Sequence, residues 1–238
     1  MNIPIIQKIN NISIVRDDLL DGGSKSIIAD YIIKQNIEKE EFVYATSVFG
    51  GFQIALSIYC KKYNKQAIIF TARRKSKHKN TLLCEKLGAT IIEVFPSYLT
   101  VIQSRAKKYC ENNPDSVLIN FGALDHVDIL GKWISTVINI FEKEPDEIWC
   151  SVGSGTLLSA ILRNTSFSNI IGVQVGRGVC IDDERLTLIK YSKPFSVESS
   201  FDCPFQSNPN YDRKAFEILI KERGYDTDKN ILFFNVMA

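Results

Sequence analysis

A lysine that directly follows two glycines near the amino terminus is well placed for covalent chemistry. The chain reads Gly22-Gly23-Ser24-Lys25, and apolar residues recur at helical spacing from there to residue 32. Ser24 can cap the first turn of such a helix, so Lys25 would stand at the positive end of the helix dipole. That position disfavours the ammonium form and favours the neutral, nucleophilic amine, which a lysine that forms a Schiff base needs. The alternative is a solvated surface lysine that follows a loop.

A glycine-rich turn in the second half of the chain is suited to binding an anion. Apolar residues 147–152 are followed by Gly153-Ser154-Gly155-Thr156 and then by a helical pattern. Glycines let backbone amides approach a phosphate closely, and the start of the helix and the two hydroxyl groups add further donors. The turn has neither the lysine of a Walker loop nor the spacing of the dinucleotide fingerprint. The alternative is a tight strand-to-helix turn that binds nothing.

A third turn follows the first strand of the alternating pattern. It contains Thr46, Ser47, Gly50 and Gly51, and Gln53 stands in the first turn of the helix that comes next. Backbone amides and the hydroxyl groups of this turn are suited to holding a substrate carboxylate at the carboxyl end of the strand. A connecting turn without a ligand is the alternative.

Apolar, β-branched segments alternate with helical patterns along the chain, and these elements must position the three turns. Such alternation is typical of parallel sheets covered by helices on both sides, so the sequence predicts an α/β architecture. Residues 176–210 have no clear period, which predicts a loop-rich cap or crossover. The expected strands are residues 42–45, 67–70, 90–95, 117–120, 147–152, 170–175 and 231–236, and the expected helices after the first are 51–62, 77–87, 98–111, 127–142, 156–162 and 212–222.

The three turns occur in the order found in fold type II pyridoxal-phosphate enzymes, the tryptophan synthase beta-like group, which the chain resembles over residues 12–175. Within that group, Arg16-Asp17-Asp18-Leu19 followed by Gly-Gly-Ser-Lys is most similar to relatives of aminocyclopropane-carboxylate deaminase and D-cysteine desulfhydrase. The segment Asn208-Pro209-Asn210-Tyr211 and the short last strand resemble compact, phage-encoded members. The resemblance implies two interleaved three-layer α/β lobes with mostly parallel sheets, a smaller one of about residues 43–125 and a larger one of about residues 1–42 plus 126–238. The cofactor would lie between them.

The resemblance also implies roles for particular residues. Lys25 would bind the aldehyde of pyridoxal 5'-phosphate as a Schiff base and later move the substrate's α proton. The phosphate-binding residues would be Gly153, Ser154, Gly155 and Thr156, and the substrate-binding residues would be Thr46, Ser47, Gly50, Gly51 and Gln53.

Three features bear on how this chain compares with the family. Family members usually have an asparagine in the substrate loop that contacts the cofactor's phenolic oxygen, whereas this chain has Gly50 and Gly51 there, so Gln53 would take over or the contact would be absent. Tyr211 is a candidate catalytic acid or base over the cofactor, as tyrosines are in the deaminase branch; the alternative is a packing role. No Ser, Thr or Glu motif that would face the pyridine nitrogen is clear after Val236.

The expected activity is that of a lyase or deaminase that acts on an amino acid through an external aldimine, by elimination or deamination. A second reading is a decarboxylase or modifying enzyme for an amino acid attached to a DNA base, as in phage hypermodification. A third is a catalytically degenerate protein that binds pyridoxal phosphate, which the missing asparagine favours. The resemblance implies a homodimer, with a small amino acid or amino-acid-modified DNA as partner.

The composition of the chain excludes several classes of protein. Of the 238 residues, 45% are hydrophobic and 24% charged, which excludes a disordered chain, and no apolar run is long enough to span a bilayer. The expectation is a soluble protein without a membrane partner. The start lacks the pattern of a secretion signal, which predicts a cytoplasmic protein, in the host cytoplasm if it is phage-encoded. Six scattered cysteines form no CxxC pair, so free thiols and no metal site are expected.

The densest basic run is residues 73–79, Arg-Arg-Lys-Ser-Lys-His-Lys, just past a predicted strand end. The net charge of +2 does not by itself indicate a nucleic-acid binder, but this run can attract a phosphate-bearing partner such as DNA. A solvated loop and helix start is the alternative. His78 and His126 lie far apart without metal-like spacing and receive no catalytic role.

Overall fold

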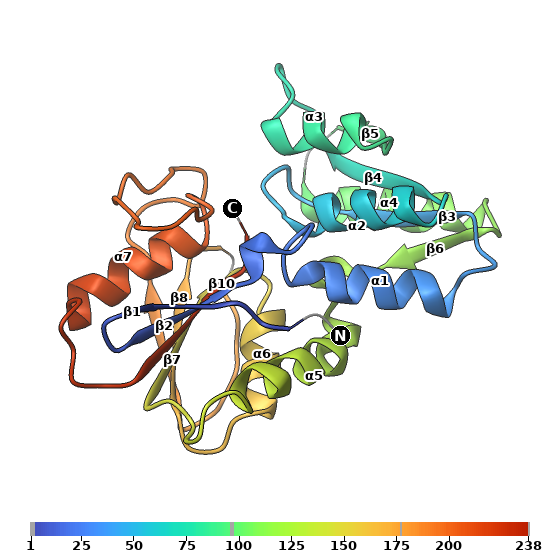
Figure 1. Ribbon diagram of the computed structural model, residues 1–238. Coiled ribbons are helices and arrows are strands. Elements are labelled where there is room, and N and C mark those ends of the chain that lie inside the picture. Colours follow the sequence, from blue (N-terminus) through green and yellow to red (C-terminus); the bar gives the residue numbers. More distant parts are fainter. Residues whose placement is uncertain (1–2, 96–97, 177, 238) are drawn as a thin grey trace. The chain divides into compact units, whose positions relative to one another are not determined.

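The protein consists of two units, each built around its own sheet (Figure 1). The structure is a computed structural model and describes residues 3–95, 98–176 and 178–237. Unit 1 comprises Met1–Ser24 and His126–Ala238, and unit 2 comprises Lys25–Asp125. Unit 2 therefore includes the helix that begins at Lys25, whereas the sequence analysis begins the smaller lobe near residue 43.

Unit 1 contains a six-stranded sheet in the order β1-β2-β10-β7-β8-β9. β1 pairs antiparallel with β2, and all other neighbours pair in parallel. The carboxyl ends of five strands therefore meet at one edge, the edge at which open α/β sheets bind ligands. The strands are β1 (Ile6–Ile9), β2 (Ile12–Arg16), β7 (Glu147–Val152), β8 (Asn169–Gln174), β9 (Leu186–Lys190) and β10 (Ile231–Asn235).

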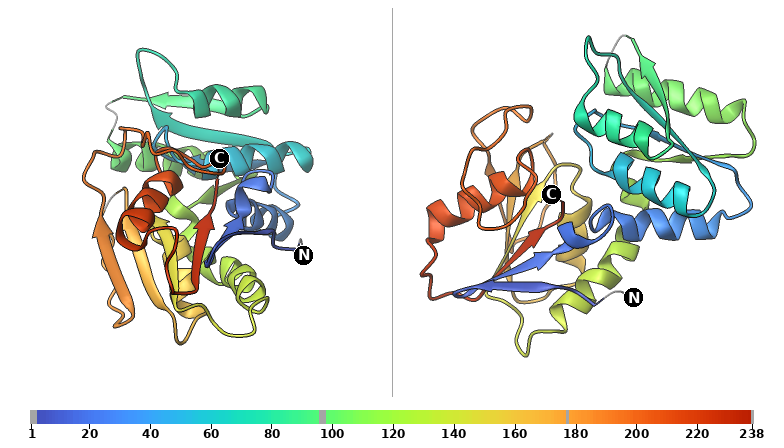
Figure 2. Two further views of the ribbon diagram at one scale, coloured as in Figure 1. Left: turned by 60° about the vertical axis from the view of Figure 1, so that its left-hand side comes forward. Right: turned by 45° about the horizontal axis from the view of Figure 1, so that its top comes forward.

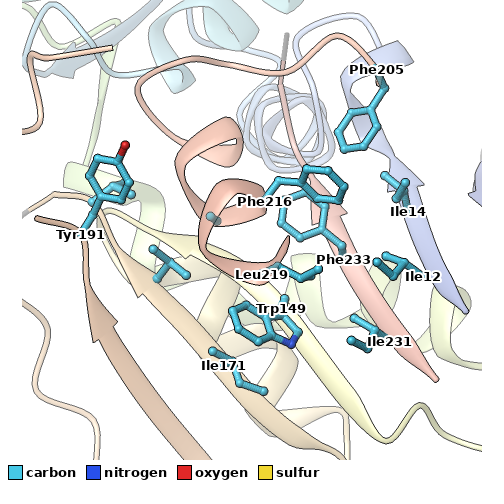
Figure 3. Packing of buried hydrophobic residues seen from close by; sticks show 13 residues of the cluster. Ile12, Ile14, Trp149, Ile171, Tyr191, Phe205, Phe216, Leu219, Ile231 and Phe233 are labelled. Atoms are coloured by element: carbon cyan, nitrogen blue, oxygen red, sulfur yellow. The ribbon is translucent and has the colours of Figure 1, made fainter. Parts of the chain in front are cut away.

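Helices cover both faces of this sheet (Figure 1). α7 (Asp212–Arg223) packs on one face, and α5 (Val127–Ile138) and α6 (Thr156–Arg163) lie on the other. Figure 3 shows Phe216 and Leu219 of α7 over Trp149 and Phe233 of the sheet, and all four side chains are fully buried. Alternate residues of the strands supply this core because side chains on a strand point to opposite faces in turn.

Unit 2 contains a parallel four-stranded sheet in the order β5-β4-β3-β6. α4 packs against β3 and β4 on one face, and α1, α2 and α3 pack in sequence on the other, as the views in Figure 2 show. The elements are α1 (Lys25–Gln35), β3 (Glu41–Ala45), α2 (Phe52–Lys62), β4 (Gln66–Ala72), α3 (Lys79–Lys86), β5 (Thr90–Val94), α4 (Leu99–Glu111) and β6 (Ser116–Ile119). Both units have three layers, as the sequence predicts.

All seven predicted strands and all predicted helices are present, with ends that differ by a few residues. The largest difference is in α5, which ends at Ile138 instead of residue 142. Three strands were not predicted: β1, β2 and β9. β9 lies inside the segment expected to be loop-rich, and residues 191–211 beyond it have no regular structure. Within the described residues, no helix is both long and apolar enough to cross a membrane.

Candidate active site

The loop that leads to Lys25 is tightly folded. β2 is followed by a 3₁₀ turn at Asp17–Leu19 and then by Gly22 and Gly23, whose φ angles are 87° and 71°. Both glycines adopt the left-handed conformation that side chains disfavour, which confirms the predicted Gly-Gly turn. A Cβ on Gly23 would lie only 2.2 Å from the carbonyl oxygen of Val236, so the loop passes against the backbone that follows β10. α1 begins at Lys25, whose side chain is partly buried.

A buried carboxyl group lies within the same loop. Asp17 is 1% exposed, and the indole Nε1 of Trp133 donates to both of its oxygens at 3.1 Å. Burial raises the pKa of Asp17 to about 7, the hydrogen bonds from Trp133 oppose this shift, and the negative charges of Asp212 and Asp18 add to it.

The turn after β7 has the form of an anion cradle. Gly155 has a φ of 88° and precedes α6, so the first amides of that helix have no acceptor within the helix itself. The hydroxyl groups of Ser154 and Thr156 lie 2.9 Å apart, and Thr156 is buried. A Cβ on Gly153 would come within 2.9 Å of a ring carbon of Tyr211. The close approach of Tyr211 to the turn therefore requires glycine at position 153.

Tyr211 lies directly before α7 and against the phosphate turn, which we define as residues 153–156. Its ring packs on Gly153 and meets the ring of Phe195 edge to face, with centroids 4.9 Å apart. The structure thus brings together two features that are 58 residues apart in the sequence, one predicted to bind phosphate and the other to act as an acid or base.

The predicted substrate loop, residues 46–51, is folded on itself at the carboxyl end of β3. A Cβ on Gly50 would lie 2.3 Å from the hydroxyl oxygen of Thr46, so only glycine fits. Gln53 is fully buried, and its amide nitrogen donates to three carbonyl groups of the loop at 2.7–3.4 Å. Gly51 caps α2, and Ser47 is partly exposed at the outside of the loop. Gln53 thus holds the loop in shape, and a direct substrate contact by Gln53 stays a prediction.

The comparisons with known proteins agree with this arrangement. The family model described as "Pyridoxal-phosphate dependent enzyme" matches residues 6–224. The chain belongs to the pyridoxal-phosphate dependent enzymes. No curated protein matches the chain by sequence.

Solved structures of several other proteins share the fold. A homologue of ACC deaminase has 18% identity and a TM-score of 0.78, over 95% of this chain and 84% of that one. An O-acetylserine dependent cystathionine beta-synthase from Helicobacter pylori has 16% identity and a TM-score of 0.75, over 99% and 88%. A hydrogen sulfide-producing enzyme from Fusobacterium nucleatum has 14% identity and a TM-score of 0.76, over 99% and 95%. The resemblance to fold type II enzymes is therefore confirmed, whereas the resemblance to phage-encoded members stays a prediction.

The residues of unit 1 fit the phosphate end of pyridoxal phosphate. The cofactor's phosphate is an anion that backbone amides and hydroxyl groups bind well. The phosphate turn offers both, and a side chain on Gly153 would collide with Tyr211. Gly155 has the left-handed conformation that glycine adopts without strain, and a Cβ there would lie 3.1 Å from the side chain of Val179.

The sequence analysis missed a second buried carboxylate in this unit. Asp212 is fully buried, and its Oδ2 accepts hydrogen bonds from the amides of Val236 at 3.0 Å and Met237 at 3.2 Å. Its Oδ1 accepts the hydroxyl of Ser151, two residues before the phosphate turn. Asp212 therefore connects the end of β7 to the segment after β10. The signal in the sequence that could have revealed Asp212 was an acidic residue next to Tyr211 at the start of a predicted helix.

The structure also places the basic run next to the predicted substrate loop of unit 2. The Arg74 guanidinium lies 5.2 Å from the centroid of the Phe49 ring, and the His78 ring meets Phe49 at 4.8 Å. Lys77 pairs with Glu85. Arg74 is exposed. The segment 73–78 therefore packs on the middle of the substrate loop rather than standing alone in solvent.

Proposed function

We propose that this pyridoxal-phosphate enzyme is a lyase or deaminase that acts on an amino acid, with Lys25 as the lysine that bonds to the cofactor. The observation that carries the proposal is the position of Lys25. It is the first residue of α1 and directly follows a left-handed Gly-Gly turn packed against the Val236 carbonyl. A fixed backbone with the amine at a helix start supports a nucleophilic lysine with a defined direction of approach.

The other proposed roles follow from the chemistry of each group. When bound, pyridoxal phosphate withdraws electrons from the amino acid's α carbon. The phosphate turn holds the cofactor's phosphate, and Ser47 with the neighbouring loop residues holds the substrate carboxylate, since the amide and hydroxyl of Thr46 already donate to the carbonyls of Phe70 at 3.0 Å and Ser47 at 3.1 Å. Lys25 would take the α proton of the substrate. Tyr211 moves a second proton, a role that the position of its ring on Gly153 supports.

Trapping of the lysine tests this proposal. Purified protein is mixed with pyridoxal phosphate, its absorbance is recorded, and borohydride reduction is followed by peptide mapping. We expect a single modified lysine, Lys25, and loss of both the absorbance band and the activity on amino acids in Lys25→Ala. Lys34→Ala is the matched control, because Lys34 is an exposed lysine on the same helix, paired with Asp30. Modification scattered over surface lysines would exclude the proposal.

A second candidate function is favoured by the basic segment beside the substrate loop. We propose as the alternative an enzyme that modifies or decarboxylates an amino acid attached to a DNA base. Its support is the contact of Arg74 with Phe49 in a strongly basic stretch. This function predicts salt-dependent binding of amino-acid-modified DNA, weakened in Arg74→Gln, and little turnover of free amino acids. Turnover of free amino acids that is unchanged in Arg74→Gln would favour the first candidate.

Cofactor binding without any turnover would indicate the third reading, a degenerate protein. The Gly50–Gly51 pair in place of the family's asparagine is the feature that motivates it. The trapping experiment described above also tests this third reading. Cofactor trapped on Lys25, with no product from amino acids or from modified DNA, would support a degenerate protein against both enzymatic readings.

A further inference from the structure

A buried lysine on α7 fixes the segment that packs against Tyr211. Lys214 is fully buried, and its Nζ donates to the carbonyls of Pro194 and Phe195, both at 3.1 Å. The same ammonium lies 5.0 Å from the centroid of the Tyr191 ring and 5.7 Å from that of the Phe195 ring. Burying an ammonium is costly unless its hydrogen bonds are satisfied, so these contacts hold the segment to α7.

The carbonyl of Phe195 is also held by the chain just before Tyr211. The side-chain amide of Asn210 donates to it at 3.0 Å. The backbone at this point is fixed in turn, because the amide of Asn210 donates to the side-chain oxygen of Asn208 at 3.0 Å. The amide of Tyr211 donates to the carbonyl of Asn208 at 3.2 Å. Phe195 is therefore fixed both by α7 and by the residues that lead to Tyr211.

The ring of Phe195 contacts the ring of Tyr211. Their centroids are 4.9 Å apart and their planes meet at 78°, an edge-to-face geometry that aromatic pairs prefer. The Tyr211 ring also lies against Gly153 of the phosphate turn, where an added Cβ would come within 2.9 Å of a ring carbon. Lys214, Phe195, Tyr211 and the phosphate turn thus form one continuous set of contacts within unit 1.

We propose that Lys214 is a positioning residue for Tyr211 and, through Tyr211, for the phosphate turn. Because Lys214 is fully buried, it acts through Phe195 and not by touching the cofactor. A ring held against Gly153 limits the conformations that the turn can adopt, and so keeps its amides in the arrangement that an anion needs. The inference rests on the proposed binding of the cofactor's phosphate by this turn and adds a residue to it.

The affinity for pyridoxal phosphate relative to that for pyridoxal, which lacks the phosphate, tests the proposal. The dissociation constant of each compound is measured from the absorbance of the protein-bound form, and the ratio of the two constants is the phosphate preference. A general loss of structure would weaken both compounds alike and leave this ratio unchanged. In Lys214→Met and in Phe195→Leu we expect the phosphate preference to fall about threefold to tenfold, the range that an edge-to-face ring pair contributes.

A double-mutant cycle with Tyr211→Ala identifies the route. Removing the Tyr211 ring should lower the phosphate preference by itself, and adding Lys214→Met to that variant should change the preference no further. A further fall in the double variant would mean that the charge of Lys214 acts on the phosphate directly, which would overturn the proposal. Lys221→Met is the matched control. Lys221 is an exposed lysine on the same helix that pairs with Glu217 at 2.5 Å, and its loss should leave the phosphate preference unchanged.

The outcomes separate this inference from the proposed function. Should Lys214→Met fail to fold, Phe195→Leu carries the test, because it removes the ring and leaves the carbonyls bonded to Lys214. A wild-type phosphate preference in Lys214→Met, Phe195→Leu or Tyr211→Ala would overturn the role of Lys214 and leave the proposed function intact. A wild type that binds both compounds equally well would overturn the role of the phosphate turn and this inference together. A fall in all three variants without a further fall in the double variant would establish the role of Lys214.

Discussion

Asp17 should make the stability of the protein depend on pH. In the unfolded chain its pKa is near the ordinary value of 3.8, whereas in the folded protein burial raises it to about 7. Well below pH 3.8 the carboxyl is neutral in both states. As the pH rises toward 7 the unfolded chain releases this proton and the folded protein does not, so the free energy of unfolding falls over this window and stays lower above it. A pKa difference of this size corresponds to about 4 kcal/mol.

Chemical denaturation at pH 5 and pH 8 measures this effect. We expect the wild type to lose stability between the two pH values, and Asp17→Asn to lose about 2 kcal/mol less because an amide does not ionise. Glu217 titrates at lower pH in both proteins, so its contribution cancels in the comparison. An equal loss in wild type and variant would show that Asp17 is ionised throughout this range.

Gly23 should tolerate alanine much less well than Gly88, although both have positive φ. At Gly88, with φ of 94°, an added Cβ meets nothing within 4 Å, so Gly88→Ala costs only the left-handed strain, about 1 kcal/mol. At Gly23 the same strain is joined by a contact of 2.2 Å with the Val236 carbonyl, which adds about 2 kcal/mol or more. The measurement is the unfolding free energy of the two variants. Equal costs would mean that the carbonyl moves away without resistance.

At the scale of elements, the irregular segment between β9 and α7 is held by side chains of α7. Lys214 is fully buried and donates to the carbonyls of Pro194 and Phe195, both at 3.1 Å. Glu217 accepts the hydroxyls of Tyr191 and Ser199, both at 2.7 Å. Since Tyr211 packs on the phosphate turn from the end of this segment, α7 connects the segment's conformation to the site.

Glu217→Gln should therefore destabilise the protein at neutral pH. Hydrogen bonds from Lys221, Tyr191 and Ser199 outweigh burial and lower the pKa of Glu217 to about 2, so its contribution is present above about pH 4.5 and is lost as the pH falls through 2. We expect a loss of about 1–3 kcal/mol at pH 7, measured by urea unfolding. Glu222→Gln, an exposed glutamate on the same helix, should change stability little. An equally stable Glu217→Gln would show that these bonds are replaced by water without cost.

The elements that the sequence predicts well are those buried on both faces. β4 and β7 are continuous apolar runs between helices, and a parallel strand of this kind has few alternatives. The strands missed are of another kind. β9, at the edge of the sheet, contains only partly buried and exposed residues, and β1 is a short antiparallel edge strand, so neither has a strong apolar pattern. β2 is as short as several strands that were predicted; it is preceded by β1 and not by a helix, so the strand–helix alternation that marks the other strands is absent there.

The features of the candidate site also differ in how well the sequence predicts them. Glycine turns are visible in the sequence because left-handed backbone and close approach demand glycine, as at Gly23 and Gly155. The contacts of Asp17 with Trp133 and of Asp212 with the segment after β10 join residues 116 and 24 positions apart. No local pattern encodes such pairs, because they exist only once the sheet of unit 1 has formed.

At the scale of the whole molecule, the two units carry different parts of the proposed chemistry. Unit 1 contains the phosphate turn, Tyr211 and the buried Asp17–Trp133 contact, and unit 2 contains the substrate loop and the basic segment. Lys25 is the first residue of unit 2 and is joined directly to the loop of unit 1. We therefore expect unit 1 to bind the phosphate group of the cofactor and unit 2 to bind the carboxylate of the substrate.

Hydrogen exchange with inorganic phosphate tests this division. We expect phosphate to slow amide exchange in peptides that contain residues 153–156 of unit 1, because helix-start amides and hydroxyls bind the anion there, and to leave peptides of the substrate loop unchanged. Thr156→Val should weaken this protection, whereas Thr136→Val, which removes a hydroxyl bonded to the Lys132 carbonyl on α5, should not. Protection that appears instead in peptides of residues 73–79 would assign the stronger phosphate site to the basic segment. That result would favour the enzyme that acts on modified DNA, because an exposed cationic segment would then bind phosphate better than the glycine turn does.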